Sequence, residues 1–168
     1  MLNRIVLCLI LSIFLMPLSH GSADEDFEAA KKLFLNQDYK KAINHLKETT
    51  EKDPSNIDAW FLLGDCYKAR KKDKKAIAAY AKVLEIDPEN QAALLSLGMS
   101  YMDKKNYTEA ISSFKKLIEM NPTHTEAHFY LGVTYDRVNR LSSAFAQYKI
   151  LKTLDGELAE KLYHIIFW

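Results

Sequence analysis

Few residues of this 168-residue chain have the types and the spacing that chemistry requires. His124 and His128 are four residues apart, the spacing at which two imidazoles on one helix can share a metal ion. Zinc needs more protein ligands than this pair supplies. His124 also follows Pro122 closely, so we expect it in a turn rather than on the helix of His128. We therefore predict that the pair binds no metal.

Other chemistry has still less support in the sequence. The motifs G-x-S-x-G, H-E-x-x-H and C-x-x-C do not occur, and neither does a phosphate-binding loop. Cys66 has two interpretations, a reactive thiol or a small buried apolar residue, and we favour the second. Because we predict no catalytic residue, no metal and no cofactor, we expect that the chain is not an enzyme.

The densest charged stretch is Lys68–Lys75, which contains six cations and one acid. One interpretation is a solvated turn whose cations lie near a helix C-terminus, where the helix dipole favours them. The other is a surface that binds an anionic partner. The whole chain has 23 basic and 22 acidic residues, a balance that argues against a general nucleic-acid binder.

The first residues differ from the rest of the chain. Arg4 precedes an uncharged apolar run of twelve residues, 5–16, and small residues follow that run. This is the pattern of a secretory signal peptide, which we predict over 1–23, with cleavage after Ala23 or alternatively after Gly21. A retained membrane anchor is the other interpretation, but about 20 apolar residues are needed to span a bilayer. We expect an exported protein, periplasmic or secreted, without stable membrane insertion after cleavage.

Four residue types recur with a single period of 34 residues. The recurring residues are Gly64, Gly98 and Gly132; Pro54, Pro88 and Pro122; Ala42, Ala76, Ala110 and Ala144; and Tyr67, Tyr101 and Tyr135. Composition alone does not produce one period in four residue types, so the chain is a repeat array.

This unit resembles the tetratricopeptide repeat (TPR), W-x₂-L-G-x₂-Y followed by A-x₃-F and a closing proline. The second unit matches the pattern with Trp60, Leu63, Gly64, Tyr67, Ala76, Tyr80 and Pro88. The first unit departs from it, because Ala29, Ala30 and Leu33 replace its Leu, Gly and Tyr. The resemblance implies an all-α fold, a right-handed α-solenoid of antiparallel helix pairs. We predict a TPR domain over 24–168, with units 23–56, 57–90, 91–124 and 125–158 and a capping helix at 159–168.

Packing explains the repeated glycines and prolines. Glycine inside a helix costs about 1 kcal/mol against alanine, so a recurring helical glycine needs a structural cause. We expect Gly64 and Ala76 to lie where two antiparallel helices cross closely. Pro88 then ends the second helix, because its ring clashes with a further helical turn.

The C-terminal segment is expected to cap the array. Three apolar residues share one helix face by their spacing and should cover the fourth unit: Leu158, Leu162 and Ile165. Ile166, Phe167 and Trp168 cannot all share that face, because consecutive helical residues diverge by about 100°. We expect this apolar tail to be exposed, folded back or buried in another copy of the chain.

The resemblance also implies a binding site, because the first helices of successive TPR units line a concave groove in which a ligand lies. Carried over unit by unit, the groove residues are Phe27, Lys31 and Phe34; Phe61, Asp65 and Lys68; Leu95, Met99 and Met102; and Phe129, Val133 and Asp136. Some TPR domains clamp the terminal carboxylate of a chaperone with Lys and Asn. That clamp is absent here, since its places hold Phe and Lys in the first unit and Phe and Asp in the second.

Four groove residues form an apolar stripe along the array: Phe27, Phe61, Leu95 and Phe129. Exposed apolar patches of this kind usually mark binding sites, and neighbouring methionines adapt to varied partners. If the groove is open, these side chains should bury little in the free protein. The alternative is that they pack among themselves in a tight superhelix.

We expect a scaffold that binds a protein or peptide partner, and not a nucleic acid, in an envelope or secretory assembly. The alternative is a structural homo-oligomer without a peptide ligand, assembled through Ile166, Phe167 and Trp168.

Overall fold

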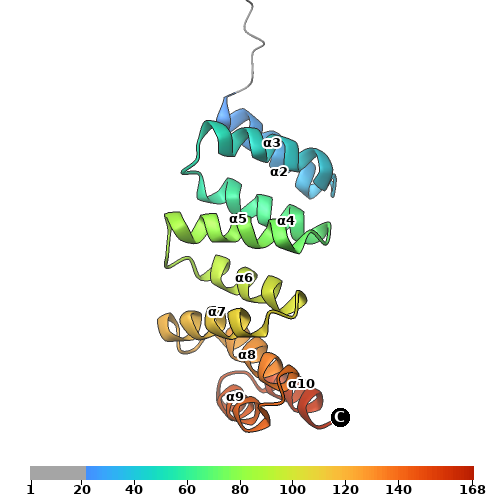
Figure 1. Cartoon of the computed structure of the whole chain (residues 1–168), viewed down its shortest axis with the longest axis vertical. Helices are drawn as coiled ribbons and strands as arrows, with labels where there is room; N and C mark the ends of the chain where they lie inside the picture. Colours follow the sequence, from blue (N-terminus) through green and yellow to red (C-terminus); the bar gives the residue numbers. More distant parts are fainter. Residues whose placement is uncertain (1–21) are drawn as a thin grey trace, which may run out of the picture.

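The computed structural model describes residues 22–168, so residues 1–21 of the predicted signal peptide lie outside the described part. Nine helices and no strand occur in residues 22–168, which confirms the predicted all-α array. Figure 1 shows four helix pairs stacked along the long axis and a single helix at the C-terminal end. The pairs are α2 (Ala23–Leu35) with α3 (Tyr39–Lys52), α4 (Ile57–Ala69) with α5 (Asp73–Ile86), α6 (Gln91–Asp103) with α7 (Tyr107–Met120), and α8 (Thr125–Arg137) with α9 (Leu141–Leu154); the last helix is α10 (Gly156–Phe167).

The turns between pairs are fixed by their own side chains. Asp53 ends α3, and its Oδ1 accepts a hydrogen bond from the Ser55 N–H at 3.0 Å. Pro54 has no N–H with which to continue the helix. Asn56 caps α4, because its Oδ1 accepts from the Ala59 N–H at 2.9 Å. The same two contacts recur 34 residues on with Asp87 and Asn90, and again with Asn121 and His124.

The turn inside each pair contains a residue in the left-handed region. These residues are Gln37, Lys71, Lys105 and Asn139, with φ between 56° and 61°. That conformation costs a residue other than glycine roughly 1–2 kcal/mol. In each pair, the next residue's N–H donates back to a carbonyl of the first helix at 2.8–2.9 Å, which offsets the cost. The period here is one of conformation, and four different side chains hide it in the sequence.

The recurring glycines make room for an aromatic ring of the second helix. A Cβ on Gly64 would lie 2.5 Å from Cε1 of Tyr80, and a Cβ on Gly98 would lie 2.5 Å from Cε1 of Phe114. Both rings are fully buried. The prediction that Ala76 sets this contact is wrong, because the three atoms nearest the added Cβ of Gly64 all belong to the Tyr80 ring. The need for space is therefore set by the ring.

The first pair follows the same size relation with smaller partners. Ala30 stands at the glycine position, and Leu46 stands sixteen residues later, at the position of the ring. Both side chains are fully buried. A methyl group on the first helix is thus matched by an aliphatic side chain, rather than a ring, on the second.

The fourth pair uses a residue from outside the pair. Tyr148 stands sixteen residues after Gly132, but a Cβ on Gly132 would instead meet Cδ2 of Leu162 on α10 at 2.5 Å. Tyr148 packs outward, with ring centroids 5.4 Å from Phe145 and 5.5 Å from Tyr163. The contact that is internal to the second and third pairs is therefore supplied to the fourth pair by the capping helix.

A shortened turn brings α10 to this position. Asp155 alone separates α9 from α10, and its side chain caps α10 by accepting from the Leu158 N–H at 3.0 Å. The other turns between pairs have four residues. As a result α10 begins at Gly156, three residues before the predicted start of the cap at residue 159.

The face of α10 that covers the array also differs from the predicted one. Leu162 is fully buried, and Leu158 and Ile166 pack against the cluster that contains it. Ile165 is 38% exposed, so its place on the capping face was predicted wrongly. The spacings i, i+4 and i, i+3 both fit a helix face, and the shortened turn decides between them.

We expect Gly98→Ala to destabilise the protein, because the new Cβ would overlap the buried Phe114 ring. Overpacking of this kind typically costs about 1–3 kcal/mol. Gly156→Ala is the matched control, since nothing lies within 4 Å of a Cβ added there. Thermal melts should show a lower midpoint for Gly98→Ala and an unchanged or higher midpoint for Gly156→Ala.

A double variant tests the same contact from its other side. Gly98→Ala combined with Phe114→Leu reproduces the Ala30–Leu46 relation of the first pair. Gly98→Ala should therefore cost less in the Phe114→Leu background than in the wild type. Equal midpoints for Gly98→Ala and Gly156→Ala would contradict the proposed ring contact.

Candidate partner-binding surface

The predicted groove residues lie on neighbouring first helices. Lys68 of α4 forms an ion pair with Asp103 of α6, with Nζ 3.8 Å from Oδ2. The hydroxyl of Thr134 on α8 lies 3.2 Å from Sδ of Met102 on α6. Since α4, α6 and α8 lie side by side, predicted residues of different units share one surface.

Eleven of the twelve predicted groove residues are half-buried. Phe61 packs on Tyr80 with 5.5 Å between ring centroids, and Phe129 packs on Tyr130 at 5.3 Å. The expectation that the stripe buries little in the free protein is therefore wrong for these two rings. They support the helix pairs from one side and present only part of their area to a partner.

The capping helix covers part of the fourth unit. Val133 lies in a buried cluster with Leu151, Ala159 and Leu162, and Phe129 packs against that cluster. Val133 is 6% exposed, so its assignment to the groove surface is wrong. The sequence placed a cap beside the fourth unit without fixing which face it covers. The other eleven positions stay predictions as partner contacts.

Asp65 connects the predicted groove to the core. Its Oδ1 accepts a hydrogen bond from the Tyr80 hydroxyl at 2.6 Å. Burial raises the pKa of Asp65 above its usual value, and the Tyr80 bond and the Lys68 charge oppose that rise. Burial, together with the bond to Asp65, also raises the pKa of Tyr80, so the phenol stays protonated and keeps donating. The carboxyl group is thus held in one orientation.

The two histidines serve the fold. His124 caps α8, because its Nδ1 accepts a backbone N–H from the first turn at 3.4 Å. His128 is buried, and its Nε2 donates to the Pro122 carbonyl at 2.9 Å. Two units earlier, the Trp60 indole N–H donates to the Pro54 carbonyl at 3.0 Å. His128 therefore replaces a tryptophan as the link between a turn and the helix that follows.

One buried charged cluster had no prediction. Asp26 of α2 is buried, and its carboxylate lies 2.5 Å from Nζ of Lys52 and 3.2 Å from Nδ1 of His45, both on α3. The hydrogen bond from Lys52 holds the pKa of Asp26 below its usual value. Asp26, His45 and Glu48 have ligand atoms within 4.8 Å of one another, but the Lys52 ammonium already neutralises the buried carboxylate. We interpret the cluster as an ion-pair network; its sequence signal is an acid 34 residues before Trp60, at a packing position.

Cys66 has the surroundings of a packing residue. It is fully buried, and burial raises the pKa of its thiol to about 12. The thiolate is the reactive form of cysteine, so a raised pKa suppresses reactivity. These properties agree with the interpretation of Cys66 as a small apolar residue.

The fold and its repeated contacts define a TPR domain. The family model described as the cytochrome c-type biogenesis protein H TPR domain matches residues 27–160. The chain belongs to this TPR family, and the predicted family is confirmed. No curated protein sequence matches the chain.

Solved structures share the fold at low sequence identity. MamA is 23% identical with a TM-score of 0.77, over 82% of this chain and 80% of its own. YrrB, described as a TPR protein with an unusual peptide-binding site, is 21% identical with a TM-score of 0.72, over 85% of this chain and 77% of its own. The first TPR of Spaghetti (RPAP3), bound to the HSP90 peptide SRMEEVD, is 19% identical with a TM-score of 0.67, over 70% of this chain and 94% of its own.

Proposed function

We propose that this chain is a protein-interaction scaffold that binds a segment of a partner along α2, α4 and α6. The observation that carries the proposal is a run of half-buried apolar side chains on these first helices: Phe27, Phe34, Phe61, Leu95, Met99 and Met102. Apolar area shared by several adjacent helices is typical of a docking surface. Because each side chain is already held from one side, little conformational freedom is lost when a ligand covers the other.

The relatives support a peptide or protein ligand. The description of YrrB names a peptide-binding site, and the Spaghetti (RPAP3) domain is bound to an HSP90 peptide. The carboxylate clamp is absent from this sequence, so we expect a different ligand from that acidic chaperone tail. An amphipathic helix or an extended apolar segment fits a surface of Phe, Leu and Met.

The test is a substitution in the centre of this surface. Peptides selected from a displayed random library on the purified protein supply the ligand, and fluorescence anisotropy measures its Kd. Met99→Lys should weaken binding by about tenfold, because the ammonium group must be desolvated under the ligand. The lysine stem can cover the same apolar neighbours, so the fold should be kept.

Met120→Lys is the matched control. Met120 is also half-buried, but it lies at the end of α7, on a second helix. We expect its effect on Kd to stay within about twofold. If the two variants bind the selected peptides equally, the first helices do not form the binding surface.

We also propose that the scaffold works in an envelope or secretory assembly. This depends on the signal-peptide pattern of residues 1–23. Within residues 22–168, no helix has the length and apolar character needed to cross a membrane. The intact mass of protein recovered from the periplasm or the medium tests the proposal. Loss of residues 1–23 or 1–21 supports export, and an uncleaved protein confined to the cytoplasm would exclude it.

The two cleavage sites differ in their effect on α2. The Ser22 hydroxyl accepts the Glu25 N–H at 3.2 Å, and the Ser22 N–H donates to the Glu25 carboxylate at 3.1 Å. Cleavage after Gly21 keeps this capping box, whereas cleavage after Ala23 removes it. Loss of such a cap costs about 1 kcal/mol, so the form that begins at Ser22 should melt at the higher temperature.

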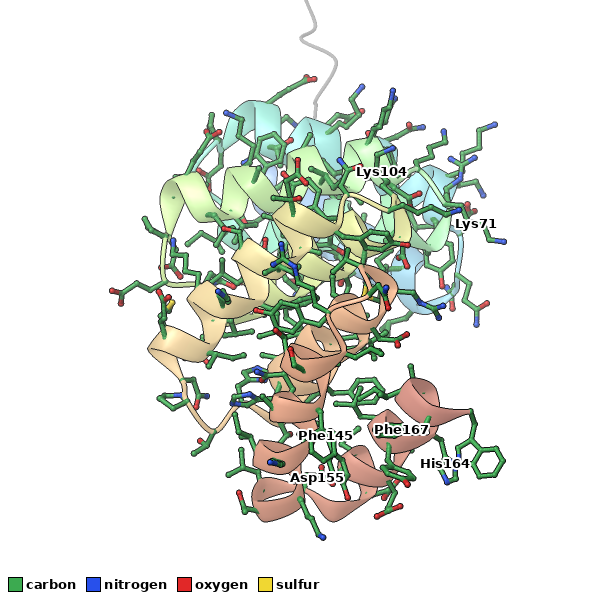
Figure 2. The ribbon with its side chains drawn as sticks, turned by 60° about the horizontal axis from the view of Figure 1, so that its bottom comes forward. Lys71, Lys104, Phe145, Asp155, His164 and Phe167 are labelled. Carbon is green, nitrogen blue, oxygen red and sulfur yellow. The ribbon has the colours of Figure 1, made fainter. Side chains whose placement is uncertain are left out.

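Self-assembly is a second candidate function, favoured by the C-terminal end. Exposed apolar side chains gather there: Tyr163, Ile165, Phe167 and Trp168. Phe167 lies 4.8 Å from Tyr163 and 6.1 Å from Phe145 between ring centroids, and Figure 2 shows Phe145 and Phe167 side by side. Ile166, which was predicted in this contact, packs against buried clusters instead.

Light scattering distinguishes the second candidate from the first. If copies associate through this end, Phe167→Ser with Trp168→Ser should halve the mass in solution. Leu35→Ser is the control, because Leu35 is exposed on α2, in the first unit. A wild-type protein that stays monomeric at high concentration would refute self-assembly and leave the scaffold proposal intact.

A further inference from the structure

A shallow cavity recurs beside the first helix of three successive units. The three cavities have volumes of about 280, 300 and 280 Å³. Each contains the fourth and eleventh residues of its unit, and the eleventh is always tyrosine: Trp60 with Tyr67, Leu94 with Tyr101, and His128 with Tyr135. The repeat thus builds one pocket per unit, and the residues that vary decide its chemistry.

The pocket of the second unit differs from the other two in charge. Lys75 and Lys82 are its only charged residues, and Trp60, Tyr67, Ala78 and Ala79 complete its lining. The pocket of the third unit contains Glu109 as well as Lys116. The pocket of the fourth unit contains Glu119 as well as Lys115. Among the three, the second therefore combines aromatic walls with positive charge alone.

A second cavity, of about 380 Å³, adjoins this pocket. Its lining residues are Lys71, Lys72, Asp73, Lys74, Lys75 and Lys104. Lys75 lines both cavities, which makes them neighbours. Lys104 follows α6, whereas the other lysines belong to the turn after α4 and the start of α5. Figure 2 shows Lys71 and Lys104 on the same edge of the molecule, so the fold adds a cation from the next unit to the stretch Lys68–Lys75.

The lysines of this cavity have no acidic partner within the described residues 22–168. Lys71, Lys72, Lys74, Lys75 and Lys104 form no ion pair there. Nζ of Lys75 lies 5.6 Å from the centroid of the Tyr67 ring, over its face. With a single acid among five lysines, the cavity attracts anions.

We infer that these adjoining cavities bind an acidic linear peptide segment that carries an apolar side chain. The carboxylates of the segment lie against Lys71, Lys72 and Lys104. Its apolar side chain enters the pocket between Trp60 and Tyr67. We call this surface the basic cleft.

The basic cleft is separate from the proposed groove. Trp60 and Tyr67 are seven residues apart and share one face of α4, whereas the groove residues Phe61, Asp65 and Lys68 lie on the next face. Consecutive residues on a helix diverge by about 100°. A partner in the groove and an acidic segment in the basic cleft can therefore bind at the same time.

The experiment uses a labelled probe peptide with one phenylalanine flanked on both sides by glutamates. Trp168→Phe leaves Trp60 as the only tryptophan of the protein. Binding should raise the anisotropy of the probe, shift the Trp60 emission and weaken as salt is added, because exposed charges are screened. Replacing the phenylalanine of the probe by serine should remove the emission shift and weaken binding.

The deciding variant is Lys71→Glu with Lys104→Glu, which should raise Kd by about tenfold or more. Lys40→Glu with Lys47→Glu makes the same change of charge on α3, at exposed lysines outside the basic cleft, and should change Kd by less than about twofold. Equal losses in the two double variants would reduce the effect to net charge and overturn the inference.

Two further outcomes are decisive. Met99→Lys should leave probe binding unchanged, so failure of the groove proposal and failure of the basic cleft can be told apart. The probe is also compared with vesicles of phosphatidylglycerol. If the vesicles bind in a manner that depends on Lys71 and Lys104 while the peptide does not bind, the cleft recognises lipid headgroups and the peptide inference is wrong.

Discussion

The side chain that fills the space above each helical glycine sets the distance between the two helices of a pair, and that distance governs all that stacks on it. In the second and third pairs a buried ring occupies this space. Removing the Cβ lowers the helix propensity of the first helix by about 1 kcal/mol, but it lets a whole aromatic ring be buried. A repeat array depends on such contacts more than a globular domain does, because each unit touches only its neighbours. A misfit in one pair therefore has no distant packing to compensate it.

The same arrangement gives each first helix two surfaces with different chemistry. One face carries half-buried apolar side chains that continue from helix to helix. The next face lines one pocket per unit, where the fourth residue of the unit varies most: Asp26, Trp60, Leu94 and His128. Each of these fits the fold differently, by an ion pair, by a bond to a proline carbonyl or by apolar contact. The scaffold thus tolerates chemical variation at this position without a change in helix geometry.

Helix pairs and turns could be predicted from the sequence because their causes are local. Pro88 removes a donor, and its effect needs no knowledge of distant residues. The partner of a glycine could not be predicted in the same way, since Ala76 and Tyr80 lie four residues apart on one face and only the crossing of the helices decides which of them fills the space. The capping face failed for a related reason, because the single-residue turn at Asp155 changes the approach of α10. In the candidate site, residue spacing identified the groove positions, but the joining of Lys104 to the other lysines is tertiary and left no sequence signal.

The space above Gly132 is filled by α10, and this changes how the two ends of the array come apart. The second and third pairs hold their own key contact, so each can open without breaking the key contact of the next. In the fourth pair that contact crosses to another element, and Asp155 serves as the end of one helix and the cap of the following one. The three helices α8, α9 and α10 therefore form a single cooperative unit, and their amide protons exchange with solvent together. Fraying from the C-terminal end must release three helices at once, whereas at the N-terminal end one pair is enough.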